Sequence, residues 1–546
     1  MIKSEFDSII FLDAIRNFKL ILKESALIMR KQTKIAAIVS AAALLAIGAS
    51  MTSFAADGWK EENGTWSYYI NGEKVTEKWQ KSGDKWFWLD ADGNMLTNQV
   101  VQDRDNYFFV DANGVMVTNN WVEVDNSNDD SDNAPATVWY YLQANGKAYK
   151  GGDNTSFKTI NGKNYAFSTD AKMLFGWVDG NSNRVTSDDA WQNCEYYLGS
   201  SNDGARATSK WVQLHVNDSA KDDPDQDYWF YFQANGKKYA AKRNGQTING
   251  KKYAFGEFGN MLTGWVASDS NTPDAAEYRN FAGSGEMKSK AWFKAVPDKA
   301  FDLANSEDGE SKELWYYADN KGFIATSEIK TINGRKYAFN EKGAMLTGVW
   351  FLNFNADGKI TGTTEIDSQD KLNSYTKLDE SPASFTRAQD KNGIYYFGEE
   401  SDGVMKTGNV NVTVDGDSYA FKFSNSGNKG VGIDKKDGSV YYVNGKKLKA
   451  DSDEKYKVYA VDPSTDVVYG VVANSMNLVN RSYNTDKMIG DKEDFSEPSG
   501  LMGNGYKYVV VSTSGALQGK GEKKDGNDVY LVTGQDKYLK GAYIKK

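Results

Sequence analysis

One segment of this sequence is written three times. The copies are TINGKNYAFSTDAKMLFGWV (residues 159–178), TINGKKYAFGEFGNMLTGWV (residues 247–266) and TINGRKYAFNEKGAMLTGVW (residues 331–350). They begin 88 and then 84 residues apart. Self-similarity at a nearly fixed period is the signature of a repeat array, and it overrides a domain count based on length. The chain is therefore expected to fold as a row of small, similar units.

Composition indicates which kind of unit repeats. The 546 residues include 51 glycines but 7 prolines, and aromatic residues make up 13% of the chain. Aromatic side chains favour strands, and glycine between them favours tight turns. The units are therefore predicted to be β-structures joined by short turns.

The first units show a hairpin pattern. Trp59 is followed seven residues later by Trp66 and two residues further on by Tyr68, and the same spacing starts again at Trp79. Residues two apart in a strand share one face, so each unit has an aromatic face. Turns such as DADGNM reverse the chain, and a single two-stranded hairpin is not stable alone. We therefore predict an all-β fold, an elongated solenoid of stacked β-hairpin repeats.

The predicted domain boundaries follow the tryptophans. All 15 lie between Trp59 and Trp350, so residues 57–350 are predicted to be Trp-rich repeats. Residues 351–393 contain no clear unit and are predicted to be an insertion or linker. Residues 394–546 still contain segments such as GSVYYVNGKK and are predicted to be a divergent, tryptophan-free β-hairpin region.

Residues 29–55 have the pattern of a secretory signal peptide. Three basic residues precede an apolar run over residues 35–47, and the small-residue site Ser53-Phe54-Ala55 follows it. We expect cleavage after Ala55, with an uncleaved membrane anchor as the alternative. Residues 1–28 are expected to be a non-native upstream extension, with Met29 as the true start. The mature protein is thus predicted to be secreted, to stay associated with the cell surface or cell wall, and to have no membrane span.

Charge and cysteine content exclude other classes. The net charge of -9 argues against nucleic acid as a partner, because such binding draws on an excess of Lys and Arg. Cys194 is the single cysteine, so no disulfide forms within the chain. Nothing near Cys194 in the sequence indicates activation, and an inert thiol is expected.

The sequence also argues against an enzyme. Zinc amidases need several histidines and cysteine peptidases need a Cys-His pair, whereas His215 is the single histidine. Carboxylates for a glycosidase are available among 74 Asp and Glu residues, but the stretches without clear units are too short for a barrel. No catalytic residue, no cofactor and no metal is predicted.

Acidic insertions separate some of the units. One of them, residues 213–227, ends with Asp223, Asp225 and Asp227 in alternation. A calcium loop of the EF-hand kind needs glycine where Tyr228 stands and a bidentate glutamate where Ala234 stands. Solvated loops are the favoured interpretation, and a calcium site is the alternative.

Several motifs carry a family resemblance. They include GWKEENGTWSYY, VWYYLQANGK, LWYYADNKG and YAFGEFGNMLTGWV. Together they resemble the choline-binding repeats of cell-wall-binding proteins from Gram-positive bacteria, to which glucan-binding and clostridial-toxin repeats are related. The resemblance extends over nearly all of residues 57–546 and is weak near the end.

The resemblance implies ligand sites between consecutive hairpins. In the family, a quaternary ammonium lies among the first Trp of a unit, the second Trp seven residues on, and an aromatic residue of the next unit, where cation–π contacts hold it. Carried over by position, this gives five sets: Trp59, Trp66 and Trp88; Trp79, Trp86 and Phe109; Trp121, Trp139 and Phe167; Trp211, Trp229 and Phe255; and Trp292, Trp315 and Phe339. The alternative for each ring is that it belongs to the core.

Two units depart from this pattern. After Trp177 the second Trp is replaced by Glu195, and after Trp265 by Glu277. A glutamate beside a cation could replace a ring electrostatically. The favoured interpretation is instead that these two positions hold no ligand.

The predicted function is non-covalent binding to the cell wall, through aromatic boxes for the choline of teichoic acid. Two alternatives stay open: binding of a glucan or other glycan by the same repeats, and a structural adhesin or spacer without a small-ligand site.

Overall fold

The computed structural model describes residues 57–127, 129–130, 134–152, 156–181, 183–268, 274–298, 312–399, 401–480, 484–485, 488–489, 494–526 and 528–545. The predicted signal peptide and upstream extension lie outside these ranges. The chain divides into two compact units, Met1–Leu262 (unit 1) and Thr263–Lys546 (unit 2). In the described ranges no helix is long and apolar enough to cross a membrane.

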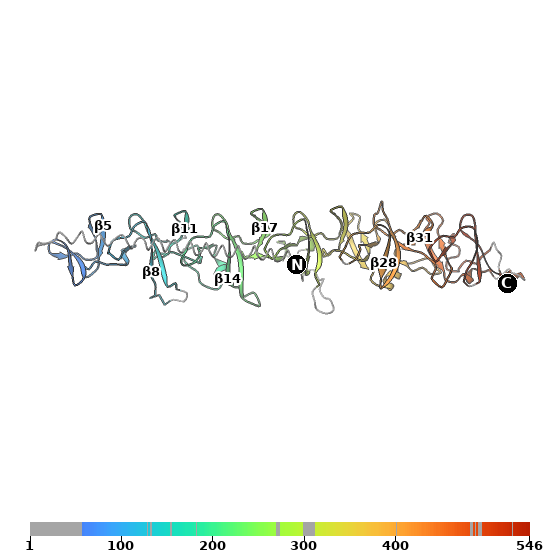
Figure 1. The fold of residues 1–546 in the computed structure, drawn as a ribbon, viewed down its shortest axis with the longest axis horizontal. Coiled ribbons are helices and arrows are strands. Elements are labelled where there is room, and N and C mark those ends of the chain that lie inside the picture. Colours follow the sequence, from blue (N-terminus) through green and yellow to red (C-terminus); the bar gives the residue numbers. More distant parts are fainter. Residues whose placement is uncertain are drawn as a thin grey trace. The chain divides into compact units, whose positions relative to one another are not determined.

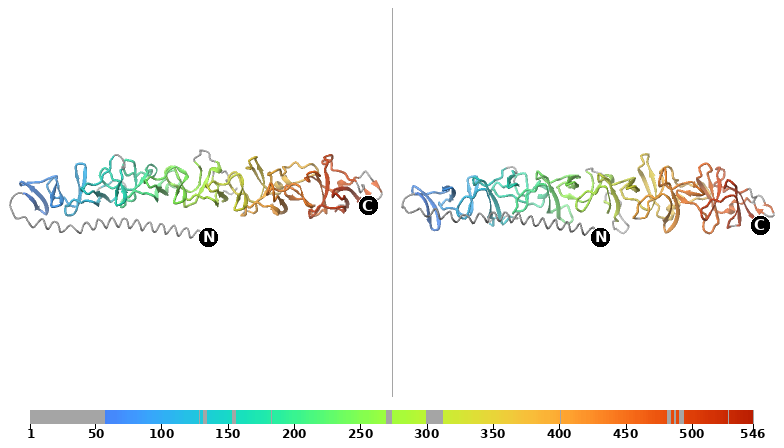
Figure 2. Two further views of the ribbon diagram at one scale, coloured as in Figure 1. Left: turned by 90° about the horizontal axis from the view of Figure 1, so that it is seen from above. Right: turned by 45° about the horizontal axis from the view of Figure 1, so that its top comes forward.

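Unit 1 is built from antiparallel hairpins in which each strand pairs with its neighbour in sequence (Figures 1 and 2). Its elements are β1 (Gly58–Glu62), β2 (Thr65–Ile70), β3 (Glu73–Lys74), β4 (Lys78–Ser82), β5 (Lys85–Leu89), β6 (Gln99–Asp103), β7 (Asn106–Val110), β8 (Asn120–Asp125), β9 (Thr137–Leu142), β10 (Lys158–Ile160), β11 (Lys163–Tyr165), β12 (Trp177–Val178), α3 (Ala190–Asn193), β13 (Tyr196–Tyr197), β14 (Lys210–Asn217), β15 (Asp225–Phe232), β16 (Lys242–Ile248), β17 (Lys251–Phe255) and β18 (Met261–Leu262).

The hairpins close as their sequences require. Between β1 and β2, Asn63 and Gly64 have φ values of 53° and 82°. Positive φ at both central residues is the geometry of the type I′ turn, which matches the twist of the two strands and favours Asn-Gly. Strand alternation then separates the faces: in β5, Phe87 and Leu89 are buried and Trp86 is exposed.

Successive hairpins stack through one recurring position, which we call the methionine position. In Met95, Met116 and Met173 the backbone N–H donates to the carbonyl of Trp66, Trp86 and Trp139 of the preceding hairpin, at 2.7, 2.9 and 2.8 Å. The second Trp of each of these units thus accepts a bond from the next hairpin. The predicted fold of stacked β-hairpin repeats is confirmed.

The turn glycine of the following hairpin packs against the methionine position. A Cβ atom on Gly114 would lie 2.8 Å from Met95 Sδ and 3.1 Å from the Leu96 carbonyl oxygen. Gly114 also has a φ of 77°, which side chains rarely adopt. Glycine at this turn is therefore required both by the conformation and by the close approach of the neighbouring hairpin.

Unit 2 begins with similar hairpins and continues into larger sheets. Its elements are β19 (Gly264–Val266), η2 (Ala275–Glu277), β20 (Arg279–Phe281), β21 (Ala291–Ala295), β22 (Leu314–Ala318), β23 (Glu328–Ile332), β24 (Arg335–Phe339), β25 (Val349–Phe354), β26 (Ile360–Glu365), α4 (Gln369–Thr376), β27 (Gly393–Tyr396), β28 (Gly408–Val414), β29 (Asp417–Phe423), β30 (Lys436–Asp437), β31 (Val440–Val443), β32 (Lys446–Lys447), β33 (Tyr456–Val461), β34 (Val468–Val472), η4 (Ser475–Leu478), β35 (Asn484–Thr485), β36 (Met488–Ile489), β37 (Lys507–Ser512), β38 (Gly521–Lys524), β39 (Val529–Thr533) and β40 (Leu539–Lys545).

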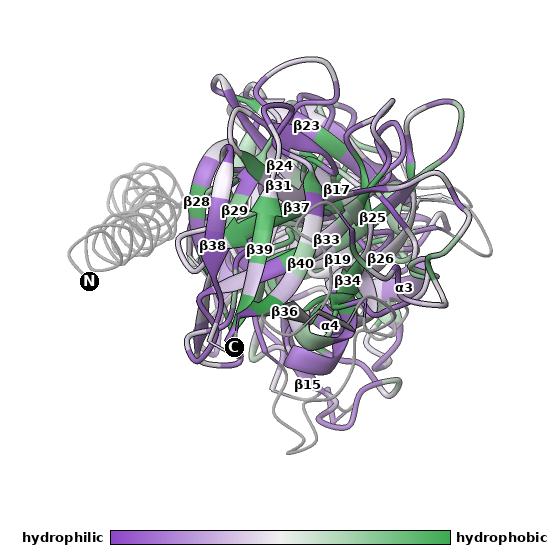
Figure 3. Ribbon diagram, turned by 90° about the vertical axis from the view of Figure 1, so that its right-hand side faces the viewer, coloured by the Kyte–Doolittle hydropathy of each residue, from purple (hydrophilic) through white to green (hydrophobic). Residues whose placement is uncertain are grey.

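The tryptophan-free part of unit 2 has cores of another composition. Val458, Val510 and Leu531 lie in one buried cluster. Figure 3 shows hydrophobic segments on β34 and β39, which contribute to these cores. Aliphatic side chains here supply the burial that aromatic rings supply in the earlier hairpins. Residues 351–393, the stretch without clear repeat units, contain β26 and α4.

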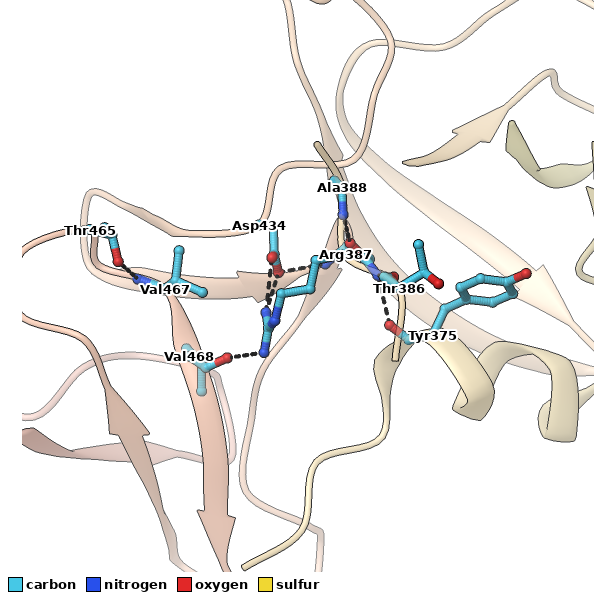
Figure 4. Close-up of polar contacts among 9 residues, drawn as sticks. Tyr375, Thr386, Arg387, Ala388, Asp434, Thr465, Val467 and Val468 are labelled. Atoms are coloured by element: carbon cyan, nitrogen blue, oxygen red, sulfur yellow. Dashed lines mark hydrogen bonds and ion pairs between the residues drawn. The ribbon is translucent and has the colours of Figure 1, made fainter. Parts of the chain in front are cut away.

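A half-buried ion pair joins distant segments of unit 2 (Figure 4). Arg387 Nη1 donates to both carboxylate oxygens of Asp434, at 3.0 and 2.9 Å, and Nη2 donates to the Val468 carbonyl. The side chains of Arg387 and Asp434 are 17% and 9% exposed. Asn444 accepts from the Ala388 N–H and donates to the carbonyls of Tyr375 and Thr386. Segments 47 to 81 residues apart in sequence are thereby joined.

The third copy of the repeated segment differs at its end. Val349 pairs with Tyr396 in the way that Trp177 pairs with Tyr197, so the valine takes the place of the tryptophan. Trp350 lies one residue on, and the pairing of β25 with β27 is regular at this point. A shift of one residue in a strand moves a side chain to the other face. Trp350 accordingly packs against a different buried cluster from Val349.

Candidate aromatic ligand sites

The first Trp of a unit packs on the next hairpin, and we call this contact surface a junction. In two junctions it meets the middle ring of the next aromatic triplet. Trp59 lies 5.1 Å from Phe87, and Trp79 lies 5.0 Å from Phe108, between ring centroids and in edge-to-face geometry. Trp79 also meets Trp88 of its own hairpin at 5.2 Å. Both distances are typical of favourable aromatic pairs.

Three other junctions share a second arrangement, in which the first Trp meets two rings of the next hairpin. It lies edge-to-face with a Tyr and stacked on a Phe. The centroid distances are 4.8 and 5.9 Å from Trp121 to Tyr165 and Phe167, 4.8 and 5.7 Å from Trp211 to Tyr253 and Phe255, and 4.7 and 5.7 Å from Trp292 to Tyr337 and Phe339.

The YAF sequence explains the second arrangement. Its middle residue is Ala166, Ala254 or Ala338, and each of these alanines is 0% exposed. An alanine cannot supply a ring, so the flanking Tyr and Phe, which share the other strand face, pack on the Trp instead.

The first two predicted sets are only partly brought together. Trp66 packs against the cluster that contains Trp59, but Trp88 packs with Trp79. Phe109 belongs to a cluster with Val122 and not to that of Trp79. Trp86 lies at the surface, 38% exposed. The rings of the next hairpin that contact Trp59 and Trp79 are therefore Phe87 and Phe108, each one residue before the predicted partner.

The other three sets are arranged closer to the prediction. Trp121, Trp139 and Phe167 lie in one cluster, where the two tryptophans are 4% and 1% exposed. Trp292 lies 6.4 Å from Trp315 and 5.7 Å from Phe339. Trp211 stacks on Phe255, and Trp229 lies on β15 opposite Gln213. Trp211, Trp229, Trp292 and Trp315 are half-buried, so their rings are reachable from solvent.

Lysine side chains of the protein itself lie over the second Trp of two units. Lys294 Nζ lies 5.3 Å from the centroid of Trp315, and Lys81 Nζ lies 5.8 Å from that of Trp86. Both distances are within the range of a cation–π contact, which contributes on the order of 0.5 to 1 kcal/mol at an exposed site. An ammonium group therefore fits over the second Trp of these units.

The two glutamates at second-Trp positions have other partners. Lys238 N–H donates to the Glu195 carbonyl, the bond that the methionine position makes to Trp66 elsewhere, so the alignment of Glu195 with a second Trp is sound. The Glu195 carboxylate pairs with Lys237 at 2.7 Å. Glu277 Oε2 accepts from the Asp274 N–H at the start of η2. Each carboxylate thus has a protein partner.

The acidic insertion of residues 213–227 is mostly a hairpin. Its ends lie in β14 and β15, which pair as far as Asn217 and Asp225, so the segment extends a hairpin instead of forming a loop. His215 Nδ1 lies 3.1 Å from Asp227 and Nε2 lies 3.8 Å from Asp225. Among the residues that the structure describes, no group of three His, Cys, Asp or Glu side chains is arranged to hold a metal ion.

Burial shifts the pKa of one junction tyrosine above its usual value of 10. It raises the pKa of Tyr165 to about 12, and a smaller effect of Asp203 acts in the same direction. The hydroxyl of Tyr165 is therefore protonated at physiological pH.

The sequence missed two kinds of residue. The first comprises the partner rings Phe87, Phe108, Tyr165, Tyr253 and Tyr337, because which face of the next hairpin meets the Trp depends on the rotation between hairpins. The second is Lys238, which occupies a methionine position. The sequence does carry that signal, because alignment of FYFQANGKKY (residues 230–239) with FWLDADGNML (residues 87–96) places Lys238 opposite Met95.

Comparison with known proteins gives one family match. Residues 75–121 match the family of choline-binding repeats. A relative, Glucosyltransferase-S from Streptococcus mutans serotype c, is 26% identical over 294 residues, which cover 53% of this chain and 15% of the relative. The chain therefore spans a small part of that protein.

Solved structures from Streptococcus pneumoniae are also similar. Choline binding protein F is 18% identical, with 73% of this chain and 100% of that chain covered and a TM-score of 0.31. CbpJ is 21% identical, with 67% and 98% covered and a TM-score of 0.30. The autolysin LytC is 18% identical, with 54% of each chain covered and a TM-score of 0.31.

Stacked antiparallel β-hairpins with aromatic junctions define an all-β repeat protein. Residues 75–121 match the choline-binding repeat family, and the chain as a whole resembles choline-binding repeat proteins, to which glucan-binding repeats are related.

Proposed function

We propose that this protein holds the bacterial cell wall non-covalently by binding choline groups of teichoic acid in its aromatic junctions. The observation that carries the proposal is the repeated cluster of Trp, Tyr and Phe rings at Trp211 and Trp292. Choline offers a cation that cannot donate a hydrogen bond through its nitrogen, so ring faces are its natural contacts, at about 0.5 to 2 kcal/mol each.

The five predicted sets are not equivalent as sites. The junctions at Trp211 with Trp229 and at Trp292 with Trp315 are our first choice, because these rings are half-buried and can be reached. The junction at Trp121 and Trp139 is closed in this conformation, since both rings are almost fully buried. The junctions at Trp59 and Trp79 would use Phe87 and Phe108 as the rings from the next hairpin.

The remaining parts of the proposal concern location and activity. We propose that the protein is exported, cleaved after Ala55 and retained at the surface by binding. The exported protein and its ligand in the cell wall then lie on the same, outer side of the membrane. We also propose that it acts by binding and not by catalysis.

Glucan binding is the second candidate. The relative named Glucosyltransferase-S favours it. Sugar rings stack on the same tryptophan faces that cations contact. The same half-buried tryptophans could therefore bind a glucan. The structural alternative is a protein whose aromatic rings all belong to the hydrophobic core and bind no ligand.

The test is a titration of the folded protein with choline, followed by tryptophan fluorescence. We expect a saturable change, and a much smaller response to the neutral carbon isostere of choline, because the isostere lacks the charge. The double variant Trp229→Ala and Trp315→Ala should lose most of the response while keeping its far-ultraviolet circular dichroism. Trp350→Phe is the matched control, because Trp350 lies outside the junction pattern, and it should respond as wild type.

The alternatives give different results. Retention on a glucan column without a choline response would replace the first proposal by the second. A protein that responds to neither ligand would favour a structural role. Unfolding of the Trp229 and Trp315 variant would assign these rings to the core.

A further inference from the structure

We infer that the junction of Trp177 carries its own cation, Lys238, in the place where other junctions would take a diffusible quaternary ammonium. The inference rests on the proposed function. It distinguishes junctions that bind choline from a junction in which a lysine of the chain itself occupies the ligand position. It makes Lys238 the residue that decides the specificity of this junction.

Lys238 occupies the methionine position of its hairpin. It forms a bridge with Phe232 as Met95 does with Leu89 and Met173 with Phe167. The turn glycine of the next hairpin, Gly259, packs on the Lys238 side chain as Gly114 packs on Met95. A long cationic side chain therefore stands where Met95, Met116 and Met173 place a thioether; Ala148, Arg184 and Ile324 take this position in other hairpins.

The ammonium of Lys238 is directed into the junction. Nζ lies 5.2 Å from the centroid of Trp177 and 6.0 Å from that of Phe230. These two rings are 5.4 Å apart, the same pairing of first Trp and next-hairpin ring seen at Trp59 and Phe87. Lys238 is 8% exposed, so its charge is largely removed from water.

Backbone carbonyls complete the site around the ammonium. Lys238 Nζ donates to the carbonyl oxygen of Trp191 and, at 3.3 Å, to that of Gln192. Both carbonyls belong to α3, a short helix in the segment that follows Trp177. A primary ammonium donates such bonds, whereas a trimethylammonium cannot, so this arrangement selects the lysine over choline.

The neighbouring lysine shows that this placement is specific. Lys237 is adjacent in sequence but points outward, 44% exposed, and pairs with the Glu195 carboxylate. Glu195 thus takes the surface charge, and Lys238 is left to the rings and carbonyls. The two lysines form a natural pair of test and control.

The space beside the junction suits a cation. Trp177 and Trp191 line a cavity of about 310 Å³ whose wall also includes Asp188 and Asp225. His215 also lines the cavity and lies 3.8 Å from Asp225, so Asp188 and the two indole rings are the groups that favour a positive guest there. Lys238 is not part of the cavity wall, and removal of its ammonium would leave another face of Trp177 free for such a guest.

A related arrangement is found at the other junction with a glutamate. Lys288 Nζ lies 4.5 Å from the centroid of Phe293, which packs on Trp265 at 5.7 Å. In both places where the second Trp is replaced by glutamate, a lysine of the chain covers a ring of the junction.

The first test measures whether Lys238 is enclosed. The folded wild-type protein is treated briefly with acetic anhydride, and acetylation of each lysine is read by mass spectrometry. Lys238 should react at least about tenfold more slowly than Lys237, because it must first be exposed by local opening. Equal rates at the two lysines would overturn the inference.

The second test measures what the ammonium displaces. Lys238→Met places at this position the residue found at Met95, Met116 and Met173, and the variant should bind one more choline per chain than wild type in equilibrium dialysis. Lys237→Met and Lys238→Arg should keep the wild-type number, because both leave a cation in the junction. An unchanged number for Lys238→Met, with circular dichroism like that of wild type, would contradict the inference.

The two tests separate this inference from the proposed function. A wild-type protein that binds no choline would remove the proposed function, while the acetylation rates would still show whether Lys238 fills the junction. If Lys238→Met fails to fold, Lys238→Gln removes the charge with a polar side chain and should likewise bind one additional choline.

Discussion

At the residue scale, the methionine position links the packing of a hairpin to its electrostatics. Lys238 occupies this position, and its ammonium group can lose a proton. Burial lowers its pKa from 10.5 to about 8, against smaller opposing effects of Cys194 and Glu195. Cys194 stays a neutral thiol over this range, because burial raises its pKa to about 11. The ion pair with Glu195 raises the pKa of Lys237, so that lysine stays charged beside it.

This pKa shift predicts a pH-dependent stability. The unfolded lysine keeps its proton up to its usual pKa of 10.5, whereas the folded one loses it near 8, so the folded state gains stability as pH rises between these values. From about pH 7 to about pH 9.5, the free energy of unfolding of wild type should rise by about 2 kcal/mol relative to Lys238→Met.

Urea unfolding of both proteins at each pH measures this difference. The comparison with Lys238→Met removes contributions from tyrosines, which are common to both. A difference that stays constant with pH would show that Lys238 is not desolvated in solution.

At the element scale, each hairpin depends on the turn of the next. Gly114→Ala should cost about 2 kcal/mol more than Gly162→Ala, because only the first adds a Cβ against a neighbouring hairpin. The two glycines have φ values of 77° and 79°, so the conformational strain is matched. Gly162 has no atom within 4 Å of such a Cβ.

Chemical denaturation of the two variants tests the stacking contact. The extra cost should shrink when Gly114→Ala is combined with Met95→Ala, because the clash with the Met95 side chain is then removed. Equal destabilisation by both single variants would mean that the turn does not press on the preceding hairpin.

The hairpins themselves could be predicted from the sequence. Which faces of neighbouring hairpins contact each other could not. Spacing of seven and two residues fixes which rings share a strand face, as at Trp59, Trp66 and Tyr68. The ring that meets Trp59 lies on another hairpin, and a rotation of that hairpin selects Phe87 over Trp88. On a YAF hairpin the middle residue is an alanine, and Tyr165 and Phe167, on the other strand face, meet the Trp instead. A local pattern does not encode this angle.

Charged positions were predicted less well for a similar reason. The replacement of a second Trp by Glu195 is visible in the sequence, but the partner that neutralises it is not. The acidic composition of residues 213–227 suggested a loop, whereas β14 and β15 use backbone pairing that tolerates exposed charges on both strands.

At the scale of the whole molecule, ligand binding and the tryptophan-free region should respond differently to choline. Binding stabilises the native state of the segments that hold the ligand. Hydrogen exchange read by mass spectrometry should therefore show increased protection of β14 to β17 and β21 to β24 with choline, and no change in β33, β37 and β39. Protection spread evenly over all these strands would contradict a local site.

The tryptophan-free region should depend on the ion pair of Arg387 with Asp434. Arg387→Leu should destabilise unit 2 by about 2 kcal/mol, because the largely buried Asp434 carboxylate keeps the backbone N–H of Asn444 but loses its charged partner. Lys371→Leu is the control: its pair with Asp367 is 47% and 51% exposed, and such pairs contribute at most about 1 kcal/mol. Thermal unfolding of both variants gives the comparison. A similar cost for the two pairs would show that Arg387 is not an anchor.

The unequal lengths of the hairpin tips have a consequence for how such a protein changes over time. The strands of β4 and β5 close directly from Ser82 to Lys85, whereas those of β8 and β9 close from Asp125 to Thr137. The stacking contacts lie at the other end, where the methionine position meets the turn glycine. New residues can therefore be inserted at a hairpin tip, by evolution or by grafting a foreign peptide. The contacts between the methionine position and the turn glycine, which stack the hairpins, would not be disturbed.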